Sequence, residues 1–144
     1  MNEKVDKVEA LLASPFFATL SAEDLAGVLA VGNTATFEPG QAIVSQGEPG
    51  DAMYIVLDGQ AEVDVGGRFH RLGPGDLLGE MALVSQSRRM ATVTATEPVE
   101  ALMIPADGFR SFLLEHPAVT LSMLRAVVAR LREVEERIDA WIAS

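Results

Sequence analysis

Short β-prone segments alternate with turn signals through the middle of the chain, and this alternation constrains the fold more than any other feature. Between residues 33 and 104 the segments are about four to eight residues long, the usual length of a strand. Glycine and proline between them supply tight-turn backbone angles and interrupt any continuous helix. The pattern predicts an antiparallel β-barrel or jelly roll of about eight strands. The turn signals are Pro39-Gly40, Pro49-Gly50, Asp58-Gly59, Gly66-Gly67 and Gly73-Pro74-Gly75.

Helical patterns flank this region on both sides. Apolar residues recur at helical spacing over residues 3–13, and Ser21 followed by Asp24 indicates the start of a second short helix. Residues 107–115 form a further short helix in this reading. Pro117 then begins a long helix that continues to about Ala143 and spans on the order of 40 Å. The sequence therefore predicts an α+β fold, with the barrel enclosed by N-terminal helices and a long C-terminal helix.

Length and composition fit one domain without a recognisable targeting or membrane-spanning segment. The 144 residues are 49% hydrophobic, enough for a core, and divide into N-terminal helices (1–30), barrel (31–104) and C-terminal helices (105–144). A net charge of −10 disfavours nucleic acid and acidic membranes as partners. The absence of cysteine excludes disulfides and thiol catalysis. Since no apolar run approaches about 18 residues and the start is polar, we expect a cytoplasmic protein.

Two neighbouring segments carry the clearest chemical signal. Residues 79–83 read Gly-Glu-Met-Ala-Leu, and residues 88–93 read Arg-Arg-Met-Ala-Thr-Val. A carboxylate accepts hydrogen bonds from sugar hydroxyls, whereas an Arg fork binds phosphate oxygens. The small residues between them allow backbone N–H groups to approach an anion. Together the segments predict a site for a ribose joined to a phosphate.

These segments resemble the phosphate-binding cassette of the cyclic nucleotide-binding domain family, which occurs in catabolite activator proteins, kinase regulatory subunits and nucleotide-gated channels. The cassette would span residues 79–93, with Met81 in place of the usual Leu. The resemblance extends further, because residues 46–51 are similar to the family's first hairpin turn and residues 53–59 to its central strand. It implies a jelly-roll domain that binds cyclic AMP or cyclic GMP without a cofactor or metal.

The resemblance also implies roles for individual cassette residues. Arg89 would clamp the cyclic phosphate. Glu80 would accept the ribose 2′-hydroxyl; a solvated loop acid or an ion-pair partner for Arg89 is the alternative. Gly79 would permit close backbone approach, and Ala82 and Ala91 would supply N–H groups with little side-chain bulk. Arg88 replaces the family's usual Pro, which makes the loop less rigid and more positive.

Recognition of the base is expected to be less specific. Met90 follows the clamp at a position where Thr accompanies cyclic GMP preference in the family, so Met favours cyclic AMP. Arg130 matches a position where some relatives cover the base with Arg, and Val134 replaces a Thr that bonds adenine in catabolite activators. Phe69 is a candidate for the same pocket, with an ordinary core position as its alternative.

The last helix carries an apolar stripe at spacings of three and four residues. We expect its early part, with Val119 and Met123, to cover the barrel. Beyond that part the stripe predicts a homodimeric coiled coil, with packing on the chain's own barrel as the alternative. The stripe comprises Leu124, Val127, Leu131, Val134, Ile138 and Trp141.

Catalytic readings find little support in the sequence. The only histidines, His70 and His116, lie in unlike contexts, and no Gly-x-Ser-x-Gly elbow occurs. We therefore expect no enzyme but a cyclic nucleotide sensor that signals to an unidentified effector protein by movement of its last helix. Because the sequence stops at Ser144 without a helix-turn-helix, direct DNA regulation is not expected. The alternatives are a degenerate barrel acting as a dimeric scaffold, and a sensor of another cyclic nucleotide, dinucleotides included.

Overall fold

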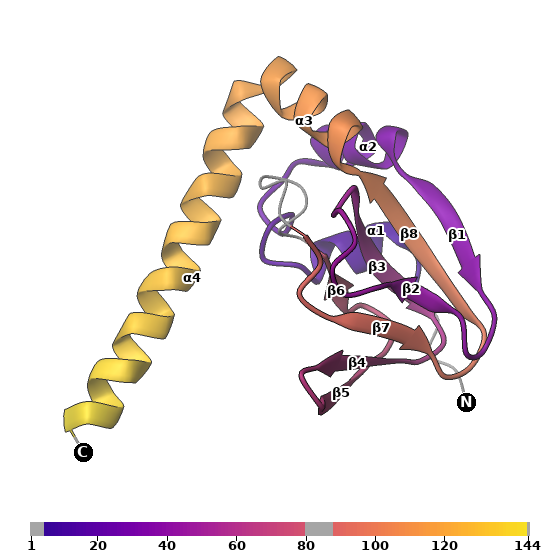
Figure 1. Cartoon of the computed structure of the whole chain (residues 1–144). Helices are drawn as coiled ribbons and strands as arrows, with labels where there is room; N and C mark the ends of the chain where they lie inside the picture. Colours follow the sequence, from indigo (N-terminus) through magenta and orange to yellow (C-terminus); the bar gives the residue numbers. More distant parts are fainter. Residues whose placement is uncertain (1–4, 80–87, 144) are drawn as a thin grey trace.

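The computed structural model describes residues 5–79 and 88–143, which form two antiparallel sheets flanked by helices (Figure 1). Each sheet has four strands within these residues. The predicted α+β class is confirmed, and so are the jelly roll of about eight strands and the long C-terminal helix. In chain order the strands are β1 (Asn33–Phe37), β2 (Ala42–Val44), β3 (Ala52–Asp58), β4 (Ala61–Val65), β5 (Arg68–Leu72), β6 (Leu77–Leu78), β7 (Thr92–Ala95) and β8 (Val99–Pro105).

The first sheet has the order β1-β8-β3-β6, and its two central strands are the most buried in the molecule. β3 pairs antiparallel with β8, with Tyr54 opposite Met103 and Ala52 opposite Pro105. Side chains alternate across β3, so Ile55 faces the helices while Val56 faces the second sheet. This alternation lets one strand contribute to two hydrophobic clusters.

The second sheet has the order β2-β7-β4-β5 and ends in a hairpin. Gly66 and Gly67 connect β4 to β5 with φ angles of 59° and 87°. Two successive positive φ values are typical of a type I′ turn, whose twist matches that of the flanking strands. The predicted hairpin at this site is confirmed.

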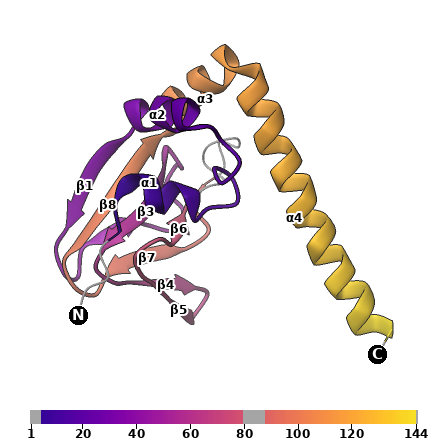
Figure 2. The ribbon, with the colours of Figure 1, turned by 180° about the vertical axis from the view of Figure 1, so that it is seen from behind.

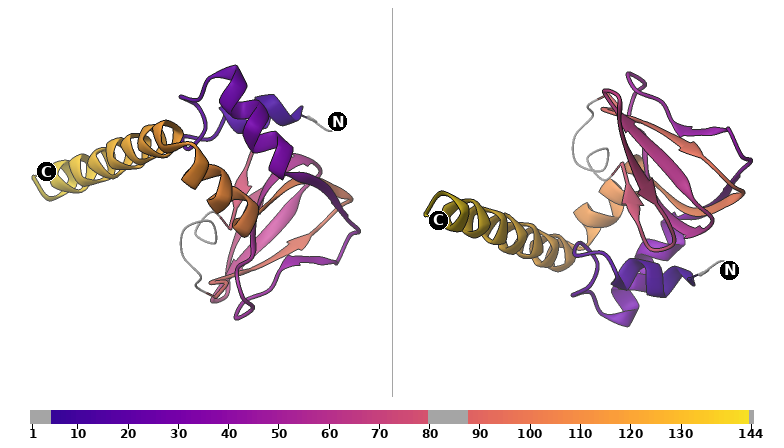
Figure 3. Two further views of the ribbon diagram at one scale, coloured as in Figure 1. Left: turned by 90° about the horizontal axis from the view of Figure 1, so that it is seen from above. Right: turned by 90° about the horizontal axis from the view of Figure 1, so that it is seen from below.

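Four helices belong to the described part of the chain, and two of them, α2 and α3, lie together across one end of the barrel (Figures 2 and 3). The Ser21 hydroxyl oxygen accepts a hydrogen bond of 3.1 Å from the Asp24 N–H, which confirms the predicted N-cap. Pro117 begins the last helix, as expected. The bounds are α1 (Lys7–Leu12), α2 (Ala22–Val31), α3 (Ala106–Glu115) and α4 (Pro117–Ala143).

Aromatic rings join the helices to the first sheet. Phe17, in the loop between α1 and α2, packs edge-on against Phe109 of α3 with ring centroids 5.9 Å apart. Both rings are fully buried. Val119 and Met123 of α4 belong to the same cluster, which also contains Met53 and Ile55 of β3, so early α4 packs on the core shared by the helices and the first sheet.

Beyond Met123, α4 extends away from the barrel (Figure 1). From Leu124 to Ile142 its side chains are exposed, apart from the half-buried Ala126. Within residues 5–79 and 88–143, no single helix combines the length and apolar character needed to cross a membrane. The α3–α4 pair, bent by 111° at its break, passes that test jointly, on length and composition only.

Candidate functional site

Arg89 is held against the start of β3 by two neighbouring groups, the Ala52 carbonyl and the Asp51 carboxylate. Its side chain is only 8% exposed, although it carries a permanent charge. Nη2 donates a 2.8 Å hydrogen bond to the Ala52 carbonyl oxygen. The same nitrogen lies 3.6 Å from Oδ1 of Asp51, whose side chain is 86% exposed. A desolvated guanidinium beside a solvated carboxylate has capacity left for a stronger anion.

Gly79 lies directly beside the Arg89 guanidinium, at the end of β6. Its φ angle of +75° belongs to the left-handed region, which favours glycine. A Cβ atom at this position would collide with Nη1 of Arg89 and come within 3.1 Å of the Ala52 carbonyl oxygen. The backbone at Gly79 therefore approaches the Arg89 guanidinium closely, whereas its approach to a bound anion stays a prediction.

Backbone hydrogen bonds fix the far end of the cassette to the turn before β3. The Arg89 N–H donates to the Glu48 carbonyl at 2.8 Å, and the Gly47 N–H donates to the Arg89 carbonyl at 2.9 Å. Arg88 adds a side-chain bond, since its Nη1 donates to the Gly47 carbonyl at 2.8 Å. Arg88 is thus bonded to this turn, at the position where the family usually has Pro.

Tyr54 reports the electrostatics around Arg89. Burial raises the pKa of the Tyr54 phenol, the Asp51 carboxylate raises it further, and the Arg89 guanidinium lowers it. The ring packs edge-on against Phe37 with centroids 6.0 Å apart. Sequence reasoning missed Tyr54 and Asp51 as neighbours of the clamp. Their position at the start of the central strand, directly after the 46–51 turn, is the signal that could have found them.

The structure places only part of the expected cassette. Glu80, Met81 and Ala82 lie outside the described residues. Met90 is 68% exposed. Ala91 is partly buried and directly precedes β7.

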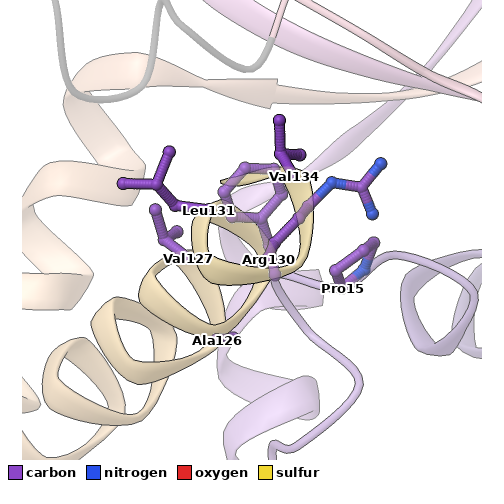
Figure 4. A pocket seen from close by; sticks show the side chains of 7 residues that line it. Pro15, Ala126, Val127, Arg130, Leu131 and Val134 are labelled. Carbon is purple, nitrogen blue, oxygen red and sulfur yellow. The ribbon is translucent and has the colours of Figure 1, made fainter. Parts of the chain in front are cut away.

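The two expected base contacts on α4 lie near a different part of the molecule. Arg130 and Val134 line a groove of about 250 Å³ together with Pro15 and Phe16 of the α1–α2 loop (Figure 4). Neither Gly79 nor Arg89 is among the residues that line this groove. The structure therefore brings Gly79 and Arg89 together but does not join them to Arg130 and Val134.

Phe69 lies on β5, an edge strand, and is 60% exposed, which excludes the alternative of an ordinary core position. It pairs with Asp64. Alternation along β5 puts Phe69 on the face opposite Leu72, which packs on the core between the sheets. This placement does not favour Phe69 as a pocket residue.

Metal chemistry gains no support from the described residues. Within residues 5–79 and 88–143, no group of three or more His, Asp or Glu side chains is arranged to hold a metal ion. The site offers instead a buried guanidinium and adjacent backbone, which are groups that bind anions.

The model of the cyclic nucleotide-binding domain family matches residues 34–116, more than half of the chain. The chain belongs to this family. A similar solved structure is the N-terminal domain of a transcriptional regulator from Streptomyces coelicolor A3(2), with a TM-score of 0.79 and 32% identity; the match covers 90% of this chain and 94% of that one. The resemblance seen in the cassette is thus confirmed for the family and its fold.

Curated relatives place such domains in longer proteins. The chain is 30% identical over 132 residues to the cyclic AMP receptor protein of Thermus thermophilus, covering 88% of this chain and 61% of the relative. It is 31% identical over 116 residues to glutaminase 2 of Bradyrhizobium diazoefficiens, covering 79% of this chain and 18% of that enzyme. The chain therefore spans less than two thirds of both relatives. The family is regulatory and generally non-enzymatic, although a matching segment occurs within this enzyme.

Proposed function

We propose that this domain is a sensor for a cyclic nucleotide, with cyclic AMP as its preferred ligand. The observation that supports the proposal best is the Arg89 guanidinium, 8% exposed and opposed, among the described residues, by one exposed carboxylate at 3.6 Å. A cyclic phosphate can replace that weak ion pair with charge-assisted hydrogen bonds. Similarity to a cyclic AMP receptor protein supports the choice of ligand. Met90 supports it too, because Met lacks the hydroxyl that accompanies cyclic GMP preference in the family.

The backbone around Asp51 offers a route from the phosphate to the C-terminal helices. Asp51 lies 3.6 Å from Arg89 through its carboxylate. Its backbone carbonyl accepts a 2.9 Å hydrogen bond from the N–H of Ala106, the first residue of α3. Movement of Arg89 toward a phosphate would release the carboxylate while the carbonyl still holds α3. We propose that α3 and α4 shift in response, which brings Arg130 over the base and signals to an effector protein. Such a switch requires the ligand to bind the two states with different affinity.

Arg89→Ala tests the assignment directly. Loss of one partner from a desolvated charge pair costs about 2–5 kcal/mol, so we expect cyclic AMP binding to weaken more than tenfold. Isothermal calorimetry with cyclic AMP and with cyclic GMP measures the change and ranks the two nucleotides. Arg110→Ala is the matched control, because it also removes one guanidinium but lies on α3 in a pair with Asp107. Unchanged affinity in Arg89→Ala would contradict the role of the clamp.

The second candidate is a domain that binds no nucleotide and acts as a dimeric scaffold. The exposed apolar side of α4 favours it, since Leu131 is 57% and Ile138 52% exposed. Folded wild-type protein, shown free of copurified nucleotide, would give no heat with either ligand in that case. A homodimer through the outer half of α4, where Ile138 lies, is part of our proposal under both candidates.

We further propose that the domain itself catalyses no reaction, binds neither nucleic acid nor membranes, and works in the cytoplasm. Its net charge of −10 supports the second point through repulsion of phosphate-rich surfaces. Its lack of cysteine is compatible with a reducing compartment.

A further inference from the structure

The groove beside Arg130 lies between two segments more than a hundred residues apart in the sequence. One wall is the α1–α2 loop, through Pro15 and Phe16. The other is one side of α4, where lining residues follow one another at spacings of three and four. Apart from Arg130 the walls are apolar side chains (Figure 4). The α4 wall comprises Ala126, Val127, Arg130, Leu131 and Val134.

Polar contacts fix α4 at its root, below this groove. The Thr120 hydroxyl donates to the Leu113 carbonyl of α3 at 2.7 Å. Two residues further along α4, the hydroxyl of Ser122 lies 3.0 Å from that of Thr19, and the two share a hydrogen bond. Val119 and Met123 are buried beside these contacts. The α1–α2 loop is therefore attached to the base of α4 and faces its next two turns across an apolar gap.

Closing such a gap lowers the free energy of the protein, because closure removes apolar surface from water. Phe16 is half-buried and already packs on the hydrophobic cluster that contains Phe17 and Phe109. Its ring is therefore held in place opposite the α4 wall. A small rotation of α4 about its root would bring Val127, Leu131 and Val134 onto this ring. Closure would also cover Arg130 and Val134, the two α4 residues proposed to meet the base.

We infer that the α1–α2 loop competes with the nucleotide for this side of α4, with Phe16 as the residue that holds the helix in the nucleotide-free position. This inference rests on the proposed function, since it names a regulator of the same site. A ligand that needs Arg130 must first draw α4 away from the loop. Its apparent affinity is then reduced by the fraction of molecules with α4 held.

Phe16→Ala removes the ring that holds α4. We expect cyclic AMP to bind this variant at least threefold more tightly than wild type by calorimetry, because less of the protein is in the held state. Leu114→Ala is the matched control, an apolar truncation on α3 at a position that is 83% exposed and outside the groove. A Phe16→Ala variant that is folded by circular dichroism and binds with wild-type affinity would overturn the inference.

A cross-link tests the same contact with Phe16 in place. The chain has no cysteine, so Pro15→Cys with Ala126→Cys introduces the only two thiols, one on each wall. We expect a short bis-methanethiosulfonate reagent to join them and to weaken cyclic AMP binding at least tenfold, with full recovery after dithiothreitol. The control pair is Pro15→Cys with Val128→Cys, since Val128 lies two residues further along α4, on its opposite side, and does not line the groove. Equal rates of cross-linking in the two pairs, or unchanged affinity in the linked protein, would overturn the inference.

These experiments separate the two proposals. If wild-type protein binds no cyclic nucleotide, the proposed function fails. The relative cross-linking rates, measured without nucleotide, still decide whether the loop holds α4. If wild type binds but neither Phe16→Ala nor the cross-link changes affinity, only the competition fails.

Discussion

The surroundings of Arg89 and the outer half of α4 differ in how much of each is held by the rest of the molecule. Arg89 is 8% exposed and contacts the start of β3, the end of β6 and the 46–51 turn. On α4, Ile138 is 52% and Ile142 69% exposed. A phosphate would meet a group already in position, whereas α4 must still be positioned. The difference fits a sensor, because the element that reports binding has to differ in energy little between its positions.

The largest expected effect is on the free energy of unfolding, and it should differ between two apolar residues of α4. Met123 is 8% exposed in the core and Ile138 is on the outer half of α4. We expect Met123→Ala to lower the free energy of unfolding by about 2–5 kcal/mol through lost burial and a cavity. Ile138→Ala should change it by less than about 0.5 kcal/mol in dilute protein. Denaturant titration measures both. An equally large loss in Ile138→Ala would mean that the outer half of α4 is covered in solution, and the contrast would disappear.

A second test asks whether a second copy covers that outer half. The stripe on α4 predicts dimers, and Ile138→Asp would place a charge in the dimer interface. We expect the variant to dissociate at least tenfold more readily, which corresponds to about 1.4 kcal/mol. Analytical ultracentrifugation over a range of concentrations measures the equilibrium. Trp141, the only tryptophan, adds a fluorescence reading from the same helix. A monomer mass for wild type at every concentration would refute the dimer.

The smallest expected effect is a change in the pKa of Tyr54, which lies beside Arg89. Tyr54 is the only tyrosine, so its ionisation can be followed by ultraviolet absorbance without interference from other phenols. We expect its pKa to lie above the ordinary value, to rise further in Arg89→Ala, and to fall in Asp51→Asn. The signs follow because a nearby cation favours the phenolate and a nearby carboxylate opposes it. Identical titrations in the three proteins would show that Arg89 and Asp51 do not lie against the phenol in solution.

The sequence predicted those features that depend on short stretches of chain. Ser21 caps α2 through a residue three positions away, and Gly66-Gly67 sets the β4–β5 hairpin by its own backbone angles. The cassette could be recognised from the sequence for the same reason, since Gly79 and Arg89 belong to one short motif. Phe69 was harder to place, because an aromatic residue in a strand suits either face until the register with β4 is known.

By itself, then, the sequence determined the order of helices and strands, the turns between them, and the residue types that suit a phosphate and a ribose. Local backbone preferences and hydrophobic periodicity are sufficient for these, because they act over a few residues. Only the tertiary structure decided that Asp51 and Ala52 hold Arg89, and that Arg130 and Val134 face Pro15 and Phe16. Those pairings join residues 37 to 119 positions apart. They depend on how the packed core orients each helix and strand, which no local preference specifies.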